Sequence, residues 1–490
     1  MSDTRGDAAQ AADLPQVGAF DELMAVRGLP PVAAGEVGVA GSDPFYRIPY
    51  RVGETTAALL AAVGVASNDI WELRTGRRQQ VRVDVRHAAA TTRTVDYTRA
   101  LGDDGQYRHV PLPADMSYML TVTQPWQARN GWVLPHFNLP HLARRVLDVL
   151  QCDYTPAAVA AAVANWDADE LEAAIAAANA CGGKIRTPQE WLAHPQGAYL
   201  AARPVIEITR IADGPPEPFP EGLGDGLRPL SGVRVLDLTR ILAGPIAGRT
   251  LAEHGADVLL VTAEKLPQTP EHVRDTSHGK RSCYLDFTRP GDHARLLALA
   301  GEADVMISGY RPGRLAAHGF GMEELMRRRP GLVYLSISCF GSGGPFAGRS
   351  GWEQVAQAVT GVCHTYGQLA NGGRPKLVFA PVCDYTTGYL GALGTMLALA
   401  RRAREGGSYH VQVSLCQSAM LIQRQGLLHD FGQAPEKLTE AELARLYVEA
   451  DTGYGRLRTL GPALQMSETP CRWARPTPAP GSDRPEWLPR

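Results

Sequence analysis

The chain has 490 residues, of which 44% are hydrophobic and 20% charged, and its formal net charge is −2. This length suffices for two or three domains, and the near-neutral charge excludes a global field that attracts nucleic acid or an anionic membrane. The eight cysteines form no CxxC pair and no histidine cluster has zinc spacing, so we expect reduced thiols, a cytoplasmic location and no metal. No charge-free apolar run of about 18 residues occurs, so we expect no membrane span.

The first half of the chain predicts helices and short strands after a mobile tail. Residues 1–40 are polar and rich in small residues and lack the apolar core of a secretory signal. Helical periodicity over Leu59–Leu73 is followed by a basic, glycine-containing tip and then by an alternating strand over Gln80–Val85. Further expected elements are a helix from Ala88, turns and short strands over 101–135, helices over His136–Cys152 and Thr155–Ala178, a mixed segment over Ile185–Leu200 and a strand at Val205–Ile208.

A segment rich in proline, glycine and acidic residues separates this half from the next. Residues 216–229 are its main part, and we expect an interdomain linker there. Strands and helices alternate beyond it, which predicts a parallel, doubly wound sheet with sites at the strand carboxyl ends. No GxGxxG follows the first strand, so a dinucleotide cofactor is not expected. The expected strands are 233–238, 257–261, 305–307 and 332–338, and the expected helices are 245–254, 295–299 and 322–329.

The stretch 377–388 is apolar up to Asp384 and leads into a long helical run, Tyr389–Arg402. A carboxylate at the junction of an extended segment and a helix has two interpretations. It can cap the helix, because aspartate accepts hydrogen bonds from the first free amides. It can also be a nucleophile or base held near the positive end of the helix. Taken alone, the local pattern favours the cap.

The two halves share an internal repeat, which is seen when each residue is aligned with the residue 330 positions later in the chain. Residues 51–83 then fall on 381–413 without a gap. Both copies predict a helix, a basic tip with glycine, a strand and a further helix. This order favours an internal duplication over a chance likeness between helix–turn–strand units. The aligned pairs include Glu54 with Asp384, Gly64 with Gly394 and Val81 with Val411.

Five motifs follow one another in the second half. They are Leu230–Pro245 (LSGVRVLDLTRILAGP), Leu251–Val258 (LAEHGADV), Gly279–Ser282 (GKRS) with Leu285 and Asp286 after it, Gly309–Gly313 (GYRPG) and Leu335–Pro345 (LSISCFGSGGP). In this order, the segment 230–422 resembles the family III CoA-transferases. These are the carnitine and bile-acid CoA-transferase type, with formyl-CoA transferase and α-methylacyl-CoA racemase as relatives.

The resemblance implies an α/β fold with a doubly wound parallel sheet domain and a smaller α+β domain. Residues 104–218 resemble the family's small domain and residues 51–89 the element before it, so we expect two fused partial halves. One half keeps the CoA site and the other has degenerated. The expected divisions are a disordered tail over 1–40, an N-terminal partial half with the small domain over 41–215, a linker over 216–229, the sheet domain with the active site over 230–425 and a helical and extended tail over 426–490.

The resemblance also implies a reaction. Asp384 matches the family's nucleophile, which attacks an acyl-CoA thioester and, through a mixed anhydride, forms an aspartyl-CoA thioester that an acceptor acid then attacks. Thr386, Thr387 and Gly388 are expected to donate amides to the oxyanion at the helix start. The expected partners are an acyl-CoA and a small carboxylic acid, without nucleic acid or membrane. Coenzyme A is expected as a substrate with no further cofactor, in a monomer of fused halves or a homodimer.

Several residues on matching motifs are expected to contact coenzyme A. Two departures weaken the match: Leu242 stands where formyl-CoA transferase has glutamine, and the strand end Val258–Thr262 lacks a lysine and a glutamate of the family. The expected contacts are Leu242 and Ala243 with the pantetheine, Tyr310 stacked on the adenine, and Lys280, Arg281, Arg311 and Arg349 with the phosphates.

Two alternative functions stay open. A racemase of the same family has a histidine about thirty residues before the aspartate, and Trp352 stands there instead, which disfavours that interpretation. A non-catalytic CoA-binding protein is the other alternative, because the strand end at Val258–Thr262 is altered. Glu54, the repeat partner of Asp384, is expected to be vestigial or structural.

Overall fold

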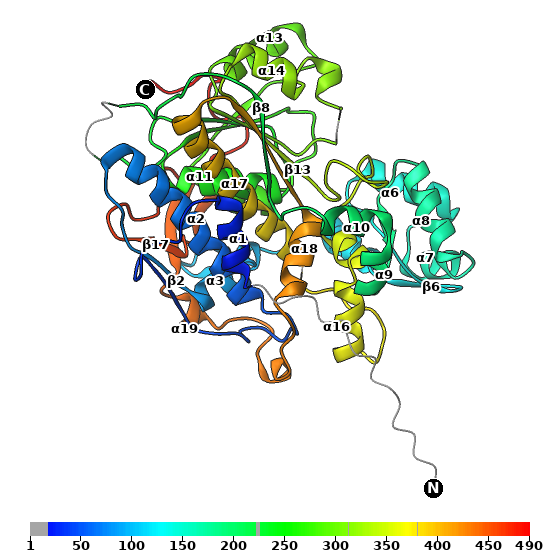
Figure 1. Ribbon diagram of the computed structural model, residues 1–490. Helices are drawn as coiled ribbons and strands as arrows, with labels where there is room; N and C mark the ends of the chain where they lie inside the picture. The colour runs from blue at the N-terminus through cyan, green and yellow to red at the C-terminus, as the bar shows by residue number, and fades with distance from the viewer. Residues whose placement is uncertain (1–17, 222–225, 312, 380) are drawn as a thin grey trace.

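A seven-stranded sheet organises the second half of the chain (Figure 1). The computed structural model describes residues 18–221, 226–311, 313–379 and 381–490. The strand order is β11-β10-β9-β12-β13-β14-β8, and all neighbours are parallel except β8, which is antiparallel to β14. The predicted doubly wound sheet is therefore present. Its strands are β8 (Glu207–Ala212), β9 (Arg234–Asp237), β10 (Asp257–Thr262), β11 (Arg281–Tyr284), β12 (Val305–Ser308), β13 (Val333–Ser338) and β14 (Ser408–Ser414).

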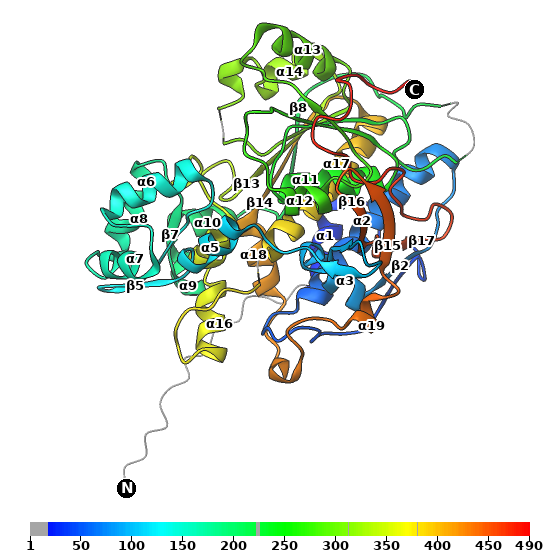
Figure 2. The ribbon, with the colours of Figure 1, turned by 180° about the vertical axis from the view of Figure 1, so that it is seen from behind.

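Helices cover both faces of this sheet. Val235 and Val305 point into one core with α11 and α17, whereas Leu236 and Met306 point into a second core with α13 and α14. Because both faces are buried, the strands are almost continuously apolar. Figure 2 shows α13 and α14 on the side away from α11 and α17. The helices of this half are α11 (Ala243–Glu253), α12 (Pro270–Thr276), α13 (Pro290–Gly301), α14 (Met322–Arg328), α15 (Glu353–Val359), α16 (Val362–Ala370), α17 (Val382–Glu405) and α18 (Leu415–Arg424), with a 3-10 turn at Ala316–His318.

The N-terminal half contains a smaller sheet of three strands, β1-β2-β17. The expectation of a tail over 1–40 is wrong from residue 18 onward, because Ala19–Arg27 is a helix whose Leu23 is completely buried. Residues 1–17 lie outside the described residues. The elements of this region are α1 (Ala19–Arg27), β1 (Val37–Ala40), α2 (Val52–Thr75), β2 (Val81–Asp84), α3 (Val85–Thr91), α4 (Thr94–Tyr97) and β17 (Leu464–Met466).

The arrangement around β2 repeats the arrangement around β14. Each strand has one parallel neighbour, β1 or β13, and one antiparallel neighbour, β17 or β8. The long helices α2 and α17 both have 24 residues, and Val382 stands 330 positions after Val52. A Cβ on Gly64 of α2 would lie 2.5 Å from Val81 Cγ1, and one on Gly394 of α17 would lie 2.6 Å from Val411 Cγ1. Helix and strand therefore approach each other at equivalent positions in both halves.

A compact small unit with its own core lies beside the large sheet in both views (Figures 1 and 2). The single helix expected over Thr155–Ala178 is two helices, because Asp167 caps a new one through its side chain. The helix expected from His136 begins at Pro140. The elements are α5 (Ala114–Val122), which was not expected, β5 (Trp126–Ala128), β6 (Gly131–Pro135), α6 (Pro140–Leu150), α7 (Pro156–Val163), α8 (Ala168–Ala177), β7 (Gly182–Lys184), α9 (Pro188–Ala193) and α10 (Pro195–Ala201).

The C-terminal segment returns to the N-terminal half. It forms a hairpin that extends the hairpin β3–β4 into a four-stranded sheet, and its last strand, β17, pairs with β2. Strand β8 of the N-terminal half in turn completes the large sheet. The two halves are thus exchanged rather than sequential domains. The remaining elements are β3 (Arg99–Leu101), β4 (Tyr107–His109), a 3-10 turn at Phe431–Gln433, α19 (Glu440–Leu443), β15 (Tyr447–Thr452) and β16 (Gly455–Leu460).

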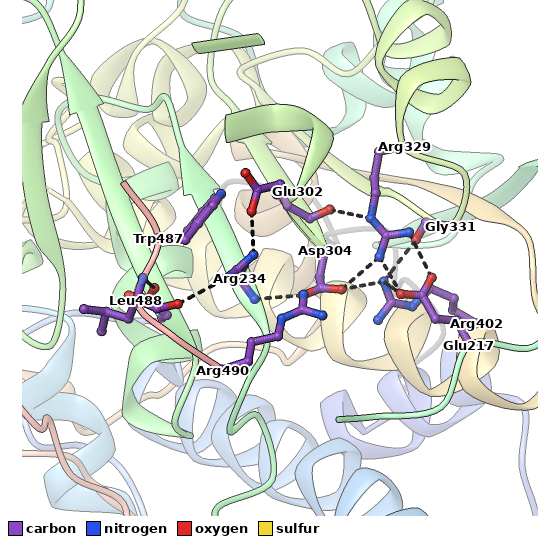
Figure 3. Close-up of polar contacts among 12 residues, drawn as sticks. Glu217, Arg234, Glu302, Asp304, Arg329, Gly331, Arg402, Trp487, Leu488 and Arg490 are labelled. Atoms are coloured by element: carbon purple, nitrogen blue, oxygen red, sulfur yellow. Dashed lines mark hydrogen bonds and ion pairs between the residues drawn. The ribbon is translucent and has the colours of Figure 1, made fainter. Parts of the chain in front are cut away.

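Ion pairs at the amino-terminal edge of the large sheet fix the expected linker (Figure 3). Asp304, just before β12, accepts hydrogen bonds from Arg329, Arg402 and Arg490. Glu217 of the linker pairs with Arg329, so this part of 216–229 is bound to the sheet. Residues 222–225 of the linker lie outside the described residues.

Within the described ranges, no helix is long and apolar enough to cross a membrane. All eight cysteines are free, and six of them are buried.

Candidate active site

Asp384 lies at a pocket of ≈ 240 Å³ beyond the carboxyl ends of β9, β12 and β13. This is the edge at which open parallel sheets bind ligands. The Asp384 side chain is buried but still reaches the pocket surface, and among the described residues no hydrogen bond to its carboxylate is recorded. The lining residues are Leu142, Thr239–Gly244, Gly309–Arg311, Ile337–Cys339, Ala347, Arg349–Trp352, Asp384 and Leu415.

A different carboxylate caps the helix that carries Asp384. Helix α17 begins at Val382, so Asp384 is its third residue. The amides of Cys383 and Asp384 donate to the Glu353 carboxylate, at 3.1 and 2.7 Å. The cap interpretation of Asp384 is therefore wrong, because the first free amides already have an acceptor. Glu353 lies on α15, and nothing in the local sequence of Asp384 indicates it.

Burial and the neighbouring Glu353 both make Asp384 harder to ionise. Burial raises the pKa of Asp384 well above its usual range, and the nearby charge of Glu353 raises it further. Burial also raises the pKa of Glu353, although the hydrogen bonds that its carboxylate accepts oppose this. Asp384 is thus a poorly solvated carboxylate without a charged partner, which increases its reactivity once it is ionised.

The expected oxyanion donors are not available. Because α17 begins at Val382, Thr386, Thr387 and Gly388 lie inside the helix, and their amides belong to its own hydrogen bonds. The Thr386 and Thr387 hydroxyls are also occupied, by the Val382 carbonyl and by Ser418. That expectation is wrong.

The start of α11 forms another part of the pocket wall. Ala243 and Gly244 are in its first turn, whose amides have no acceptor within a helix. Ile241 just before it has φ 74°, which is strained for a β-branched residue and fixes the direction in which the helix begins. Gly388 of α17 allows this approach, because a Cβ there would lie 2.5 Å from Ile246 Cβ and 2.7 Å from the Ala243 oxygen.

The structure brings most of the expected CoA-contacting residues to this pocket. Leu242, Ala243, Tyr310, Arg311 and Arg349 all line it. Arg349 also has an ion pair with Glu172 at 3.6 Å, and its guanidinium stacks on Phe346. Pro312, in the same loop as Tyr310 and Arg311, lies outside the described residues.

Lys280 and Arg281 do not line this pocket. The Lys280 ammonium is fully buried and pairs with Asp237 at 2.8 Å. Arg281 pairs with Asp257 and donates to the carbonyl of Glu486, so the C-terminal segment covers it. Their motif matches the family, but the side chains hold the sheet together. Arg240, which the sequence analysis did not select, lines the pocket instead.

Trp352 occupies the position at which a racemase would have its histidine. The indole lines the pocket and stacks on His136 of the N-terminal half, with ring centroids 5.3 Å apart. His136 Nε2 bonds Gln354 Oε1, and burial lowers the pKa of His136 to about 4, so the ring is neutral near pH 7. His136 is not among the residues that line the pocket.

A second group of titratable side chains lies away from the pocket. Atoms of Glu253, His254 and Cys471 that could bind a metal lie within 4.8 Å of one another. Burial raises the pKa of Glu253 to about 7. The positive charge of Arg228 influences all three groups, which opposes a further cation at this place.

Comparison with known proteins identifies relatives over most of the chain. The model of "CoA-transferase family III" matches residues 10–215 and 230–449. An acyl-CoA transferase of Gibberella moniliformis is 30% identical over 455 residues, which cover 83% of this chain and 79% of that protein.

Other relatives match a shorter part of the chain. A succinate–glutarate CoA-transferase of Agrobacterium fabrum is 32% identical over 233 residues, 44% of this chain and 58% of that protein. An acetyl-coenzyme A transferase of Hypoxylon pulicicidum is 38% identical over 192 residues, 38% of this chain and 32% of that protein. Among solved structures, a CAIB/BAIF family protein from Brucella suis is 28% identical, covers 47% of this chain and 65% of that chain, and has a TM-score of 0.37.

Proposed function

The chain belongs to CoA-transferase family III, and from this we propose that it transfers coenzyme A from an acyl-CoA to a carboxylic acid with Asp384 as the covalent nucleophile. The observation that carries the proposal is the place of Asp384. It is a poorly solvated carboxylate with no ion pair among the described residues, at the strand ends where open parallel sheets bind ligands and between two helix starts. The relatives described above are named as transferases of acyl-CoA, of acetyl-coenzyme A, and of CoA between succinate and glutarate, which supports an acyl-CoA and a small carboxylic acid as the substrates.

The reaction needs no external base. The Asp384 carboxylate attacks the thioester carbonyl, the C–S bond breaks, and a mixed anhydride forms as the CoA thiolate leaves. The thiolate attacks the aspartyl carbonyl, which releases the donor acid and leaves an aspartyl-CoA thioester. The acceptor carboxylate then attacks this thioester, which expels the CoA thiolate and forms a second mixed anhydride. The thiolate finally attacks the acceptor acyl carbon of that anhydride, which forms the new acyl-CoA and releases the Asp384 carboxylate. Each step exchanges one acyl bond for another of similar activation, so covalent catalysis by a carboxylate suffices.

The oxyanions of these steps need donors, and the first turn of α11 is placed to provide them. Ala243 and Gly244 line the same pocket as Asp384, and their amides stand at the positive end of a helix. Around them, Leu242 would contact the pantetheine, Tyr310 the adenine, and Arg240, Arg311 and Arg349 the phosphates. We assign Lys280 and Arg281 a structural role.

We also infer that the chain arose by an internal duplication. Three correspondences support this: the equal helices α2 and α17, the strand directions around β2 and β14, and the caps of α3 and α18, where Asp84 and Ser414 accept from the amides of His87 and Gln417. The N-terminal copy even keeps a carboxylate cap, since the Glu54 amide donates to Asp43 at 2.8 Å. Its Glu54 carboxylate, however, pairs with Arg51 at 2.9 Å, which leaves one site with a free nucleophile.

A trapping experiment tests the proposed function. The protein is incubated with a panel of acyl-CoA esters and then with hydroxylamine, and the peptide that contains Asp384 is examined by mass spectrometry. We expect a hydroxamate at Asp384 in the wild type and none in Asp384→Ala, with Glu54→Ala as the matched control that still forms it. Unmodified wild type that nonetheless binds CoA would favour a non-catalytic CoA-binding protein. Exchange of an α-proton without CoA transfer would favour a racemase, although Trp352 stands where a racemase would have its histidine and His136 does not line the described pocket.

A further inference from the structure

Helix α6 brings positive charge from the N-terminal half to the mouth of the pocket. Its Leu142 is the one residue of this half among the pocket lining. Arg145 follows one turn later on the same helix and is partly exposed, with Nη1 donating to the carbonyl of Asn179. Arg240 and Arg311 face the same pocket from the strand ends. Arg145 does not itself line the pocket, but its place on α6 puts a cation of the N-terminal half one turn from a lining residue.

Among the described residues, three of these cations have no acidic partner. In the parts of the chain that the structure describes, no ion pair is recorded for Arg145, Arg240 or Arg311, whereas Arg349 pairs with Glu172. The pKa of His141, which also lies on α6, is lowered by partial burial and then by Arg145, Arg240 and Arg311. The pKa of Arg311 is lowered by burial and by Arg314 and Arg145. The groups are therefore close enough to repel one another, and an anion between them would relieve this repulsion.

The pocket is too small to hold a whole CoA thioester. Its ≈ 240 Å³ is below the range of sites that enclose drug-sized ligands, so it admits only the reacting end. The charged part of CoA, with its diphosphate and 3′-phosphate, must then lie at the mouth. Arginine is the side chain best suited to phosphate there, because its planar donors bind two oxygens together.

Building on the proposed function, we propose that α6 is the second wall of the phosphate site, and that Arg145 binds a phosphate group of CoA from the side opposite Arg240 and Arg311. The N-terminal half then has a direct part in the reaction of the C-terminal half. It supplies a ligand-binding helix, although its own repeat of the nucleophile is paired with Arg51.

Calorimetric titration of the full-length protein with CoA and with phosphate-free pantetheine tests this proposal. Arg145→Gln keeps an amide donor for the Asn179 carbonyl, Arg145→Lys keeps the charge, and Arg129→Gln is the matched control because Arg129 is an exposed arginine of the same unit, 3.4 Å from Glu170. We expect the Kd of CoA to rise about tenfold in Arg145→Gln and less in Arg145→Lys, with a weaker dependence on salt. Pantetheine binding should not change in any variant.

Two results would overturn the proposal. One is a Kd of CoA in Arg145→Gln within twofold of the control. The other is an equal loss of affinity for CoA and for pantetheine, which would mean that the substitution damages the pocket. Thermal unfolding of each variant checks that it is folded. The failure of this proposal can be distinguished from the failure of the proposed function. If Arg145→Gln loses CoA affinity but the wild type transfers no acyl group, only the proposed transferase function is refuted. If instead a hydroxamate forms at Asp384 but the Arg145 variants bind CoA as tightly as the control, the proposed phosphate contact of Arg145 is refuted and the transferase proposal is not.

Discussion

At the scale of single residues, Asp384 is placed at a cost to stability. Its pKa is raised in the folded protein by burial and by Glu353, so folding favours the protonated form. The stability of the fold is then highest below the ordinary pKa of aspartate and falls as the pH rises through the raised pKa. A reactive carboxylate is thus held in surroundings that destabilise it, as is common in active sites.

Asp384→Asn should separate these two effects. The neutral amide has almost the same shape, so at pH 7 we expect the melting temperature to rise by about 2 °C while acyl transfer is abolished. Differential scanning calorimetry between pH 4 and 8 measures the first effect, and the gain should shrink toward pH 4. If Asp384→Asn melts at a lower temperature than the wild type at pH 7, the ionised Asp384 does not destabilise the fold as we infer.

Glu353→Gln should change the pH dependence of the reaction. Asp384 must be ionised to attack, so kcat/KM rises with pH through its pKa. Removing the charge of Glu353 removes one cause of the raised pKa, and the acidic limb should therefore move to lower pH. Asp43→Asn is the matched control, because Asp43 caps α2 in the same way without a nucleophile at the pocket. If the acidic limb of the kcat/KM profile moves equally in both variants, the loss of a helix cap, and not the loss of the Glu353 charge, causes the shift.

At the scale of elements, the approach of α11 to α17 sets the geometry of the pocket. Gly388→Ala would place a methyl group against the backbone of α11, which cannot move without shifting Ala243 and Gly244. We expect a loss of stability of about 1–3 kcal/mol and a loss of kcat larger than the change in KM. Gly291→Ala, where a Cβ would meet nothing within 4 Å, is the control. Urea unfolding and steady-state kinetics measure the two effects, and an unchanged kcat would refute the role of this contact.

The elements also show what the sequence can predict. The ends of β9, β10, β12 and β13 were predicted to within one residue, because apolar runs bounded by loops are a local signal. The strand expected at Val205–Ile208 lies at Glu207–Ala212 instead, and β11 was not expected. Asp384 was selected as the candidate nucleophile because motifs fix its place in the chain, and this role stays a prediction. The roles of Glu353 and Arg240, and the place of α6 beside the pocket, were missed, since they depend on which surfaces meet. Lys280 shows the converse: a motif gave its position but not the direction of its side chain, which pairs with Asp237.

At the scale of the whole molecule, the exchange of strands makes the two halves depend on each other. β8 completes the large sheet from the first half, and β17 completes the small sheet from the end of the second. The sequence indicated two partial halves, but the predicted order of separate domains with a linker between them did not include this exchange. Only non-local strand pairing shows it, and such pairing leaves no local pattern.

Removing residues 455–490 should therefore damage a distant region. The deletion exposes the edge of β2 and removes the partner of β3, so we expect loss of cooperative unfolding and aggregation rather than a shortened, active protein. Circular dichroism during heating and size-exclusion chromatography measure this. Deleting only residues 484–490, which would remove the contact of Arg490 with Asp304, is the milder control. A soluble truncated protein with the melting curve of the wild type would show that β17 is dispensable.

The pairing of β17 with β2 also has a consequence during synthesis on the ribosome. β2 leaves the exit tunnel several hundred residues before its partner, so its edge and the apolar side of α2 remain uncovered for most of translation. At about 5–20 residues per second, this period lasts tens of seconds. The nascent chain is therefore expected to need a chaperone over this region, and neither half can complete its fold until the last strand has emerged.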